Sequence, residues 1–77
     1  MGNYELNKFE LPILNINGQA YKFQPPLNML ELISYLGFNM NVIVVDYNKT
    51  VLSKEYWNKT DLKNKDAIEI LTIAGGG

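Results

Sequence analysis

Residues 11–24 read LPILNINGQAYKFQ and decide where the fold begins. Apolar and polar residues alternate before the Asn17-Gly18 pair, with Leu14 and Ile16 as the apolar members, and they alternate again after it. Apolar side chains at every second position face one side of a strand. The two central positions of a type I′ turn need φ above zero, which Asn and Gly tolerate. The stretch therefore predicts a β-hairpin.

A helix is predicted directly after the hairpin. Pro25-Pro26 ends the second strand, because proline cannot donate a ladder hydrogen bond. Asn28 is suited to be the N-cap of a helix, with Glu31 three residues later as its capping-box partner. Apolar residues then recur at helical spacing until Gly37, which is typical of a helix end. We expect about two and a half turns with one apolar face.

A second strand pair is predicted after the helix. The block VIVV, residues 42–45, together with Tyr47 is typical of a largely buried strand. Residues 48–49 form its turn, and residues 50–52 form a short returning strand.

The last third of the chain predicts a short helical turn and a final strand. Ser53 is placed to cap the turn, and Trp57, the sole Trp, is interpreted as packing beneath the edge of the sheet. A polar turn at residues 64–66 leads into AIEILTI, residues 67–73, which alternates as a strand does.

This order of elements places the chain in the α+β class, with a ubiquitin-like β-grasp fold. We expect a mixed sheet of four to five strands, one main helix on one face and a flexible C-terminal glycine tail, since a single helix covers only one face. The first and last strands are expected side by side and parallel in the middle of the sheet. Residues 1–10, which are polar and unpatterned, are expected to be a flexible N-terminal extension, and residues 11–77 the domain. The predicted core consists of Leu14, Ile16, Tyr21, Phe23, Leu30, Ile33, Leu36, Val42, Val44, Ile68 and Ile70.

Composition excludes several classes of function. The 77 residues carry a formal net charge of -1, which gives no basic field for nucleic acid or an anionic membrane surface. The chain has no Cys and no His, so a disulfide, a thiolate nucleophile, the usual zinc sites and the commonest general base are all missing. The longest apolar run is too short to cross a bilayer, and the polar start lacks a signal peptide. We expect a cytoplasmic protein, or a protein of the plastid stroma if a plastid genome encodes it.

The remaining feature is the tail Ala74-Gly75-Gly76-Gly77. Ordering glycine costs conformational entropy, so a terminal glycine run contributes nothing to the fold. A tail without Cβ atoms can instead enter a narrow channel and carry its carboxylate into the active site of a partner. Such a run is also found as a frayed end, but its position directly after the last strand of a ubiquitin-like layout favours the functional interpretation. The predicted reactive group is therefore the carboxylate of Gly77, with Gly75 and Gly76 giving it access.

Residues 42–77 resemble the thiamine-biosynthesis sulfur carrier family ThiS. The shared features are the hydrophobic strand with its return, a Trp in the short helix, the DAIEI block at residues 66–70 and the closing glycines. The hairpin at Asn17-Gly18 and the helix after it match the front half of the family, so that the resemblance covers residues 13–77. Family members often carry Pro-Arg where this chain has Ser53-Lys54, and a turn Gly-Asp where it has Lys65-Asp66.

The resemblance implies a reaction cycle in which residues 11–77 form a ubiquitin-like sulfur carrier domain. A ThiF-type adenylyltransferase would activate the carboxylate of Gly77 with ATP and Mg²⁺, so that the carrier itself binds no cofactor and no metal. A cysteine desulfurase or another persulfide donor would supply the sulfur. The resulting thiocarboxylate would pass its sulfur to thiazole synthase, which makes the carrier a co-substrate and not an enzyme.

The open face of the sheet predicts where these partners dock. By alternation, Ile13, Leu71 and Ile73 point away from the helix, and exposed apolar clusters usually mark partner surfaces. An N-terminal extension over this face is the alternative.

Other functions stay open at this point. The small subunit of molybdopterin synthase also ends in Gly-Gly, although the short Trp57 helix and the DAIEI block favour ThiS. A ubiquitin-like modifier or a pure binding module would also fit the fold. The lysines at 54, 59, 63 and 65 are interpreted as a solvated face, and a modifier would use such lysines as acceptors.

Overall fold

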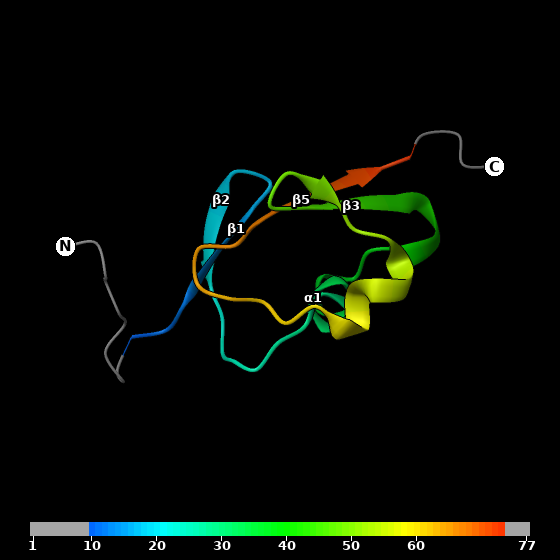
Figure 1. Cartoon of the computed structure of the whole chain (residues 1–77). Coiled ribbons are helices and arrows are strands. Elements are labelled where there is room, and N and C mark those ends of the chain that lie inside the picture. The colour runs from blue at the N-terminus through cyan, green and yellow to red at the C-terminus, as the bar shows by residue number, and fades with distance from the viewer. Residues whose placement is uncertain (1–9, 74–77) are drawn as a thin grey trace.

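A computed structural model describes residues 10–73 of the chain (Figure 1). The predicted extension, residues 1–10, lies outside the described residues except for Glu10. The described part follows the predicted order of elements, with a short 3₁₀ helix before the third strand. These elements are β1 (Ile13–Ile16), β2 (Gln19–Lys22), α1 (Met29–Leu36), η1 (Met40–Val42), β3 (Ile43–Tyr47), β4 (Thr50–Val51), η2 (Lys54–Lys59) and β5 (Ala67–Thr72).

The strands form one mixed five-stranded sheet in the order β2-β1-β5-β3-β4. β1 and β5 are parallel and adjacent, with Asn15 opposite Ala67 and Ile16 opposite Ile68. β3 runs antiparallel to β5 on its other side. The helices α1 and η2 lie on the same side of this sheet (Figure 1). The sheet order and the single helical layer confirm the predicted β-grasp fold.

None of the helices described in residues 10–73 has the length and apolar character that crossing a membrane requires.

Local sequence signals account for the hairpin and the helix. Asn17 and Gly18 have φ of 50° and 86°, as a type I′ turn requires. The Asn28 side chain accepts a hydrogen bond of 2.8 Å from the Glu31 N–H, and the Glu31 carboxylate accepts one of 2.9 Å from the Asn28 N–H. This is the predicted capping box. Gly37 ends the helix with φ of 81°, in the left-handed region where glycine has no Cβ to clash.

The core lies between the sheet and the helical layer. Trp57 is 2% exposed, which confirms the prediction that it packs under the sheet. Leu30 is partly buried and packs against the core. The buried hydrophobic residues are Leu14, Ile16, Phe23, Met29, Leu32, Ile33, Ile43, Val45, Trp57, Leu62, Ile68 and Ile70.

The predicted register of β3 is wrong by one residue. Ile43 and Val45 are buried, whereas Val42 and Val44 are only partly buried. The 3₁₀ helix η1 continues through Val42, so the alternation of the strand starts at Ile43. A shift of one residue moves every side chain of a strand to the other face.

Two further core predictions and one cap are corrected. Tyr21 is 46% exposed because β2 is an edge strand, and Leu36 is 41% exposed on the last turn of α1. Ser53 precedes η2, but its side chain makes no cap hydrogen bond. Its backbone C=O closes the turn instead, accepting a 2.9 Å hydrogen bond from the N–H of Tyr56.

Candidate functional site

The candidate site is the C-terminal end of β5, which the fold holds in the middle of the sheet. Ile73 is the last described residue, and its N–H donates to the C=O of Val42 at 2.7 Å. The backbone of β5 and of Ile73 is thus bound to β3 and to Val42 as far as the structure describes the chain (Figure 1). The predicted tail residues Gly75, Gly76 and Gly77 follow within residues 74–77, which lie outside the described residues.

The Asn17 side chain continues the pairing of β5 where β1 stops. Pairing between β1 and β5 ends at Ile16 and Ile68. Beyond it, the Asn17 Oδ1 accepts a hydrogen bond of 2.7 Å from the Ile70 N–H, and Nδ2 donates one of 3.3 Å to the Ile70 C=O. One side-chain amide thus satisfies both backbone groups of Ile70, which in a continued parallel ladder would bind two different residues of β1. This second role of a turn asparagine was missed by sequence reasoning, because the turn chemistry alone explains the residue.

We expect Asn17→Gly to lower the free energy of unfolding by about 1–3 kcal/mol, since it leaves a part-buried N–H and C=O at Ile70 without their partner. Glycine keeps the positive φ of the turn, so the loss is not one of turn strain. Urea denaturation measures the change. Asn41→Gly is the control, because the Asn41 side chain takes part in an exposed hydrogen bond of 3.0 Å, which it accepts from the Lys54 amine. Equal stability of the Asn17 variant and the wild type would contradict this role.

A buried carboxylate holds the other end of β5. Asp66, directly before the strand, accepts hydrogen bonds from the Tyr47 hydroxyl at 2.7 Å, the Lys63 N–H at 2.7 Å and the Asn48 side chain at 3.2 Å. Asn48 also accepts a 2.7 Å hydrogen bond from the Ala67 N–H. The network ties the start of β5 to the turn between β3 and β4. Sequence reasoning placed Asp66 in a polar turn and did not find these partners.

The turn before β5 also accommodates a departure from the ThiS pattern. Lys65 stands where family members often have Gly, and it has φ of 72°. This is the left-handed region that favours glycine. Lys65 thus adopts a conformation that glycine adopts without strain, and its N–H donates to the C=O of Ile13 at 2.6 Å.

The pKa of Tyr47 is raised to about 12 by burial and by the hydrogen bond and negative charge of Asp66. An unfolded Tyr titrates near about 10. A pKa that is higher in the folded state gives stability that is complete below the unfolded value and is lost as pH rises through the folded one. We therefore expect the free energy of unfolding to fall between pH of about 10 and about 12.

We expect Tyr47→Phe to lower the free energy of unfolding by about 1.5–3 kcal/mol at neutral pH. Between pH of about 10 and about 12, the free energy of unfolding should fall less in this variant than in the wild type. Urea denaturation at pH 7 and at alkaline pH measures both effects. Tyr35→Phe removes a hydroxyl from a residue that is 87% exposed and serves as the control. If the free energy of unfolding falls by the same amount at alkaline pH in Tyr47→Phe and in the wild type, this hydroxyl does not have the proposed role.

An apolar patch lies next to the end of β5 on the open face of the sheet. Leu71 is 57% exposed and Ile73 is 46% exposed. Val44 lies opposite Leu71 in the register, so it belongs to the same face. We call these three residues the β5 patch. Val44 was missed as a patch member because the sequence assigned it to the core.

Ile13 lies on the same face but not in this patch. Asn15 is level with Ala67, and the Lys65 N–H donates to the C=O of Ile13, so that Ile13 is level with Lys65, two residues before β5. Six residues of strand separate that level from Leu71, a distance of roughly 20 Å. The structure brings Leu71 and Ile73 together and leaves Ile13 at the far end of the sheet.

Within residues 10–73, His, Cys, Asp and Glu side chains do not gather into a group of three that could hold a metal ion. A strand that is fixed at its start, middle and end gives the tail a defined point of exit.

Comparison with known proteins places this arrangement in a family. The model of the ThiS family matches residues 14–77. The chain is 42% identical over 62 residues to the uncharacterized protein ycf40 of Trieres chinensis, covering 80% of this chain and 85% of that protein. It is 27% identical over 66 residues to the sulfur carrier protein ThiS of Bacillus subtilis, covering 84% of this chain and 100% of that protein.

A solved structure shares the fold. The crystal structure of the thiamine biosynthesis protein ThiS from Geobacter metallireducens matches with a TM-score of 0.74 and 34% sequence identity. The match covers 84% of this chain and 99% of the Geobacter chain. The residues matched by the family model include the helical layer, β5 and all of the sheet except Ile13. The chain belongs to the ThiS family.

Proposed function

We propose that this chain is a sulfur carrier of thiamine biosynthesis and that the carboxylate of Gly77 is the group that carries the sulfur. The proposal rests above all on the family match, which extends from residue 14 through the glycine run to residue 77. The names of the Bacillus and Geobacter relatives, a sulfur carrier protein and a thiamine biosynthesis protein, agree with it.

The proposed chemistry begins with activation of a poor electrophile. A carboxylate oxygen of Gly77 attacks the α-phosphate of ATP, which gives an acyl adenylate and releases pyrophosphate. The adenylate turns that oxygen into part of a leaving group. A persulfide sulfur then attacks the acyl carbon and AMP departs, and reduction of the resulting disulfide bond by a thiol leaves a thiocarboxylate. Thiazole synthase takes its sulfur, and the carboxylate returns.

The structure is consistent with a tail that enters the active site of a partner enzyme and a folded domain that stays outside it. Residues 74–77 follow a strand that is fixed by Asp66, Asn17 and Val42, and four extended residues reach about 14 Å. The reacting group can thus reach a buried active site while the folded domain stays outside. ATP and Mg²⁺ are handled by a ThiF-type adenylyltransferase, and the carrier takes part as a co-substrate.

The mass of the intact chain isolated from cells tests this function. We expect a fraction with one oxygen replaced by sulfur, which disappears when the adenylyltransferase is absent. A ladder of conjugates to other proteins would identify a protein modifier instead. A sulfur-bearing form that is consumed by molybdopterin synthase and not by thiazole synthase would assign the chain to the other carrier class.

We expect Leu71→Glu to weaken binding to the adenylyltransferase at least about tenfold, because it places a charge in the β5 patch where the partner would remove it from water. The melting temperature should stay nearly unchanged, since more than half of the Leu71 side chain is in contact with solvent. Calorimetric titration of the two purified proteins measures the affinity.

Ile13→Glu is the matched control, because it makes the same change on the same face at the opposite end. An equal loss of affinity in both variants would mean that the docking surface covers the whole open face of the sheet. Unaltered affinity in the Leu71 variant would remove the β5 patch from the interface.

A further inference from the structure

A second apolar surface lies on the helix side of the sheet, away from the β5 patch. It is a groove of about 380 Å³ between the edge strand β2 and the helix α1. Tyr21 and Phe23 form its sheet wall, and Leu32 and Leu36 form its helix wall. Tyr21 and Leu36, which the sequence assigned to the core, are each more than 40% exposed here. The groove is thus open to solvent, and the sulfur chemistry proposed for the tail makes no use of it.

β2 also offers unpaired backbone groups along the rim of this groove. Among the strands of residues 10–73, β2 pairs with β1 alone, and the Phe23 N–H donates to the C=O of Pro12 at 3.0 Å. Bonded and non-bonded pairs alternate in an antiparallel ladder, so the next residue along β2 toward the turn, Lys22, and then Ala20 belong to non-bonded pairs. Their N–H and C=O groups point away from β1, toward the free edge. An edge of this kind accepts an added strand.

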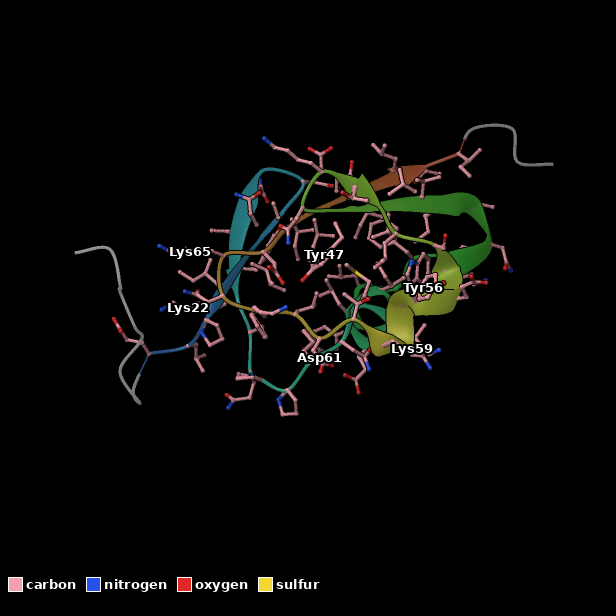
Figure 2. All side chains as sticks on the ribbon, viewed as in Figure 1. Lys22, Tyr47, Tyr56, Lys59, Asp61 and Lys65 are labelled. Atoms are coloured by element: carbon pink, nitrogen blue, oxygen red, sulfur yellow. The ribbon has the colours of Figure 1, made fainter. Side chains whose placement is uncertain are left out.

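Charge selects the kind of strand that would add here. Among the described residues that line the groove, Lys22 has the single charged side chain. Figure 2 shows Lys22 at the end of the sheet that also carries Lys65. A strand that places apolar side chains in the groove would therefore be favoured if an acidic side chain lay beside Lys22.

We propose that the groove binds an extended segment of a partner protein, which adds to the edge of β2. Alternate apolar side chains of this segment enter the groove between β2 and α1, and a neighbouring acidic side chain pairs with Lys22. The backbone groups of Ala20 and Lys22 supply the hydrogen bonds of the added strand. Because the groove and the β5 patch lie on opposite faces of the sheet, the segment and a tail-processing enzyme can bind at the same time.

The probe is a fluorescein-labelled peptide of ten residues, in which two Asp precede an alternating Ile-Thr tract. We expect saturable binding to the full chain, measured by fluorescence anisotropy. Leu36→Glu should weaken it at least about tenfold by placing a charge in the groove. Ala20→Pro should have a similar effect, because it removes an N–H at the free edge and leaves the ladder to β1 intact.

Charge reversal separates the pairing with Lys22 from general apolar binding. Lys22→Glu should weaken binding of the acidic peptide and strengthen binding of a peptide in which Lys replaces both Asp residues. Leu71→Glu is the control and should bind the acidic peptide as the wild type does. Thermal melting of every variant excludes unfolding as the cause of a loss.

Several results would overturn the proposal. These are the absence of saturable binding, or binding that neither Leu36→Glu nor Ala20→Pro changes. Concentration-dependent dimers in sedimentation that Leu36→Glu abolishes would assign the groove to a second copy of this chain. Peptide binding that arises only after removal of residues 1–9 would assign it to the chain's own N-terminal segment. ATP-pyrophosphate exchange with the activating enzyme should be unchanged in the Leu36 and Ala20 variants, so this test fails or succeeds independently of the sulfur-carrier function.

Discussion

Deletion of Gly77 is expected to lower the rate of adenylation about a hundredfold, with no change in the melting temperature. The variant ends in a carboxylate on Gly76, which is chemically equivalent but lies about 3.5 Å short of its position in the wild type. A displacement of even about 1 Å in a reacting group can cost about a hundredfold in rate. The core of the described fold, residues 10–73, is complete before the glycine run, so we expect the fold to be preserved.

One Ala added after Gly77 should have the same effect, since it lengthens the tail and introduces a Cβ. ATP-pyrophosphate exchange with the activating enzyme measures the rate, and thermal melting checks the fold. One Gly added before Met1 is the control, because it changes the length of the chain and leaves the tail intact. Should both tail variants exchange at the wild-type rate, the terminal carboxylate is not the reacting group and the sulfur-carrier proposal fails.

Trp57→Ala is expected to cost about 3–5 kcal/mol of unfolding free energy. The indole is buried against the core, and its N–H donates a 3.0 Å hydrogen bond to the C=O of Leu52. The substitution leaves a cavity and removes the partner of that carbonyl. A domain of this size has a total stability of about 4–12 kcal/mol, so the variant should be largely unfolded or close to it at 37 °C.

Urea denaturation followed by circular dichroism measures this loss. Tyr56→Ala is the matched control: it removes the neighbouring aromatic ring, which is half exposed, and should cost less than about 1 kcal/mol. Similar losses in the two variants would mean that the orientation of η2 against the sheet is wrong.

The sequence predicted those parts of the fold that depend on neighbours in the chain. The Asn17-Gly18 turn and the capping box of Asn28 and Glu31 each involve residues within three positions of one another. Their conformations follow from side-chain chemistry that acts locally. The parallel pairing of β1 and β5 was also predicted, because the order of elements leaves few ways to close one sheet.

The register of β3 could not be predicted from VIVV. Every residue of this run is apolar, so that either set of alternate residues could face the core. The pattern therefore gives no reason to bury Val45 and not Val44. The choice is made by η1 before the strand and by pairing with β5. For the same reason the sequence could place Leu71 on the open face but could not show how far Ile13 lies from it. That distance depends on a register between residues more than fifty positions apart.

The hydrogen bonds that hold β5 in place could not be predicted from the sequence for a related reason. Asp66 meets Tyr47 across 19 positions, and Asn17 meets Ile70 across 53. A polar residue in a turn has an adequate local explanation, so nothing in the sequence called for a distant partner. The groove beside β2 was missed because Tyr21 and Leu36 fit the apolar pattern of their elements, and exposure depends on where the neighbouring helix ends.

The central place of β5 also bears on how the chain is made. In the sheet, the β1–β2 hairpin and the β3–β4 hairpin meet only through β5, which is the last strand of the described chain to leave the ribosome. Contacts between residues so distant in the chain form late and slow the folding of small domains. A chain whose translation stops before Ala67 has two hairpins and no strand to join them. We expect such a product to be degraded, so that cellular quality control would remove chains that are truncated before β5.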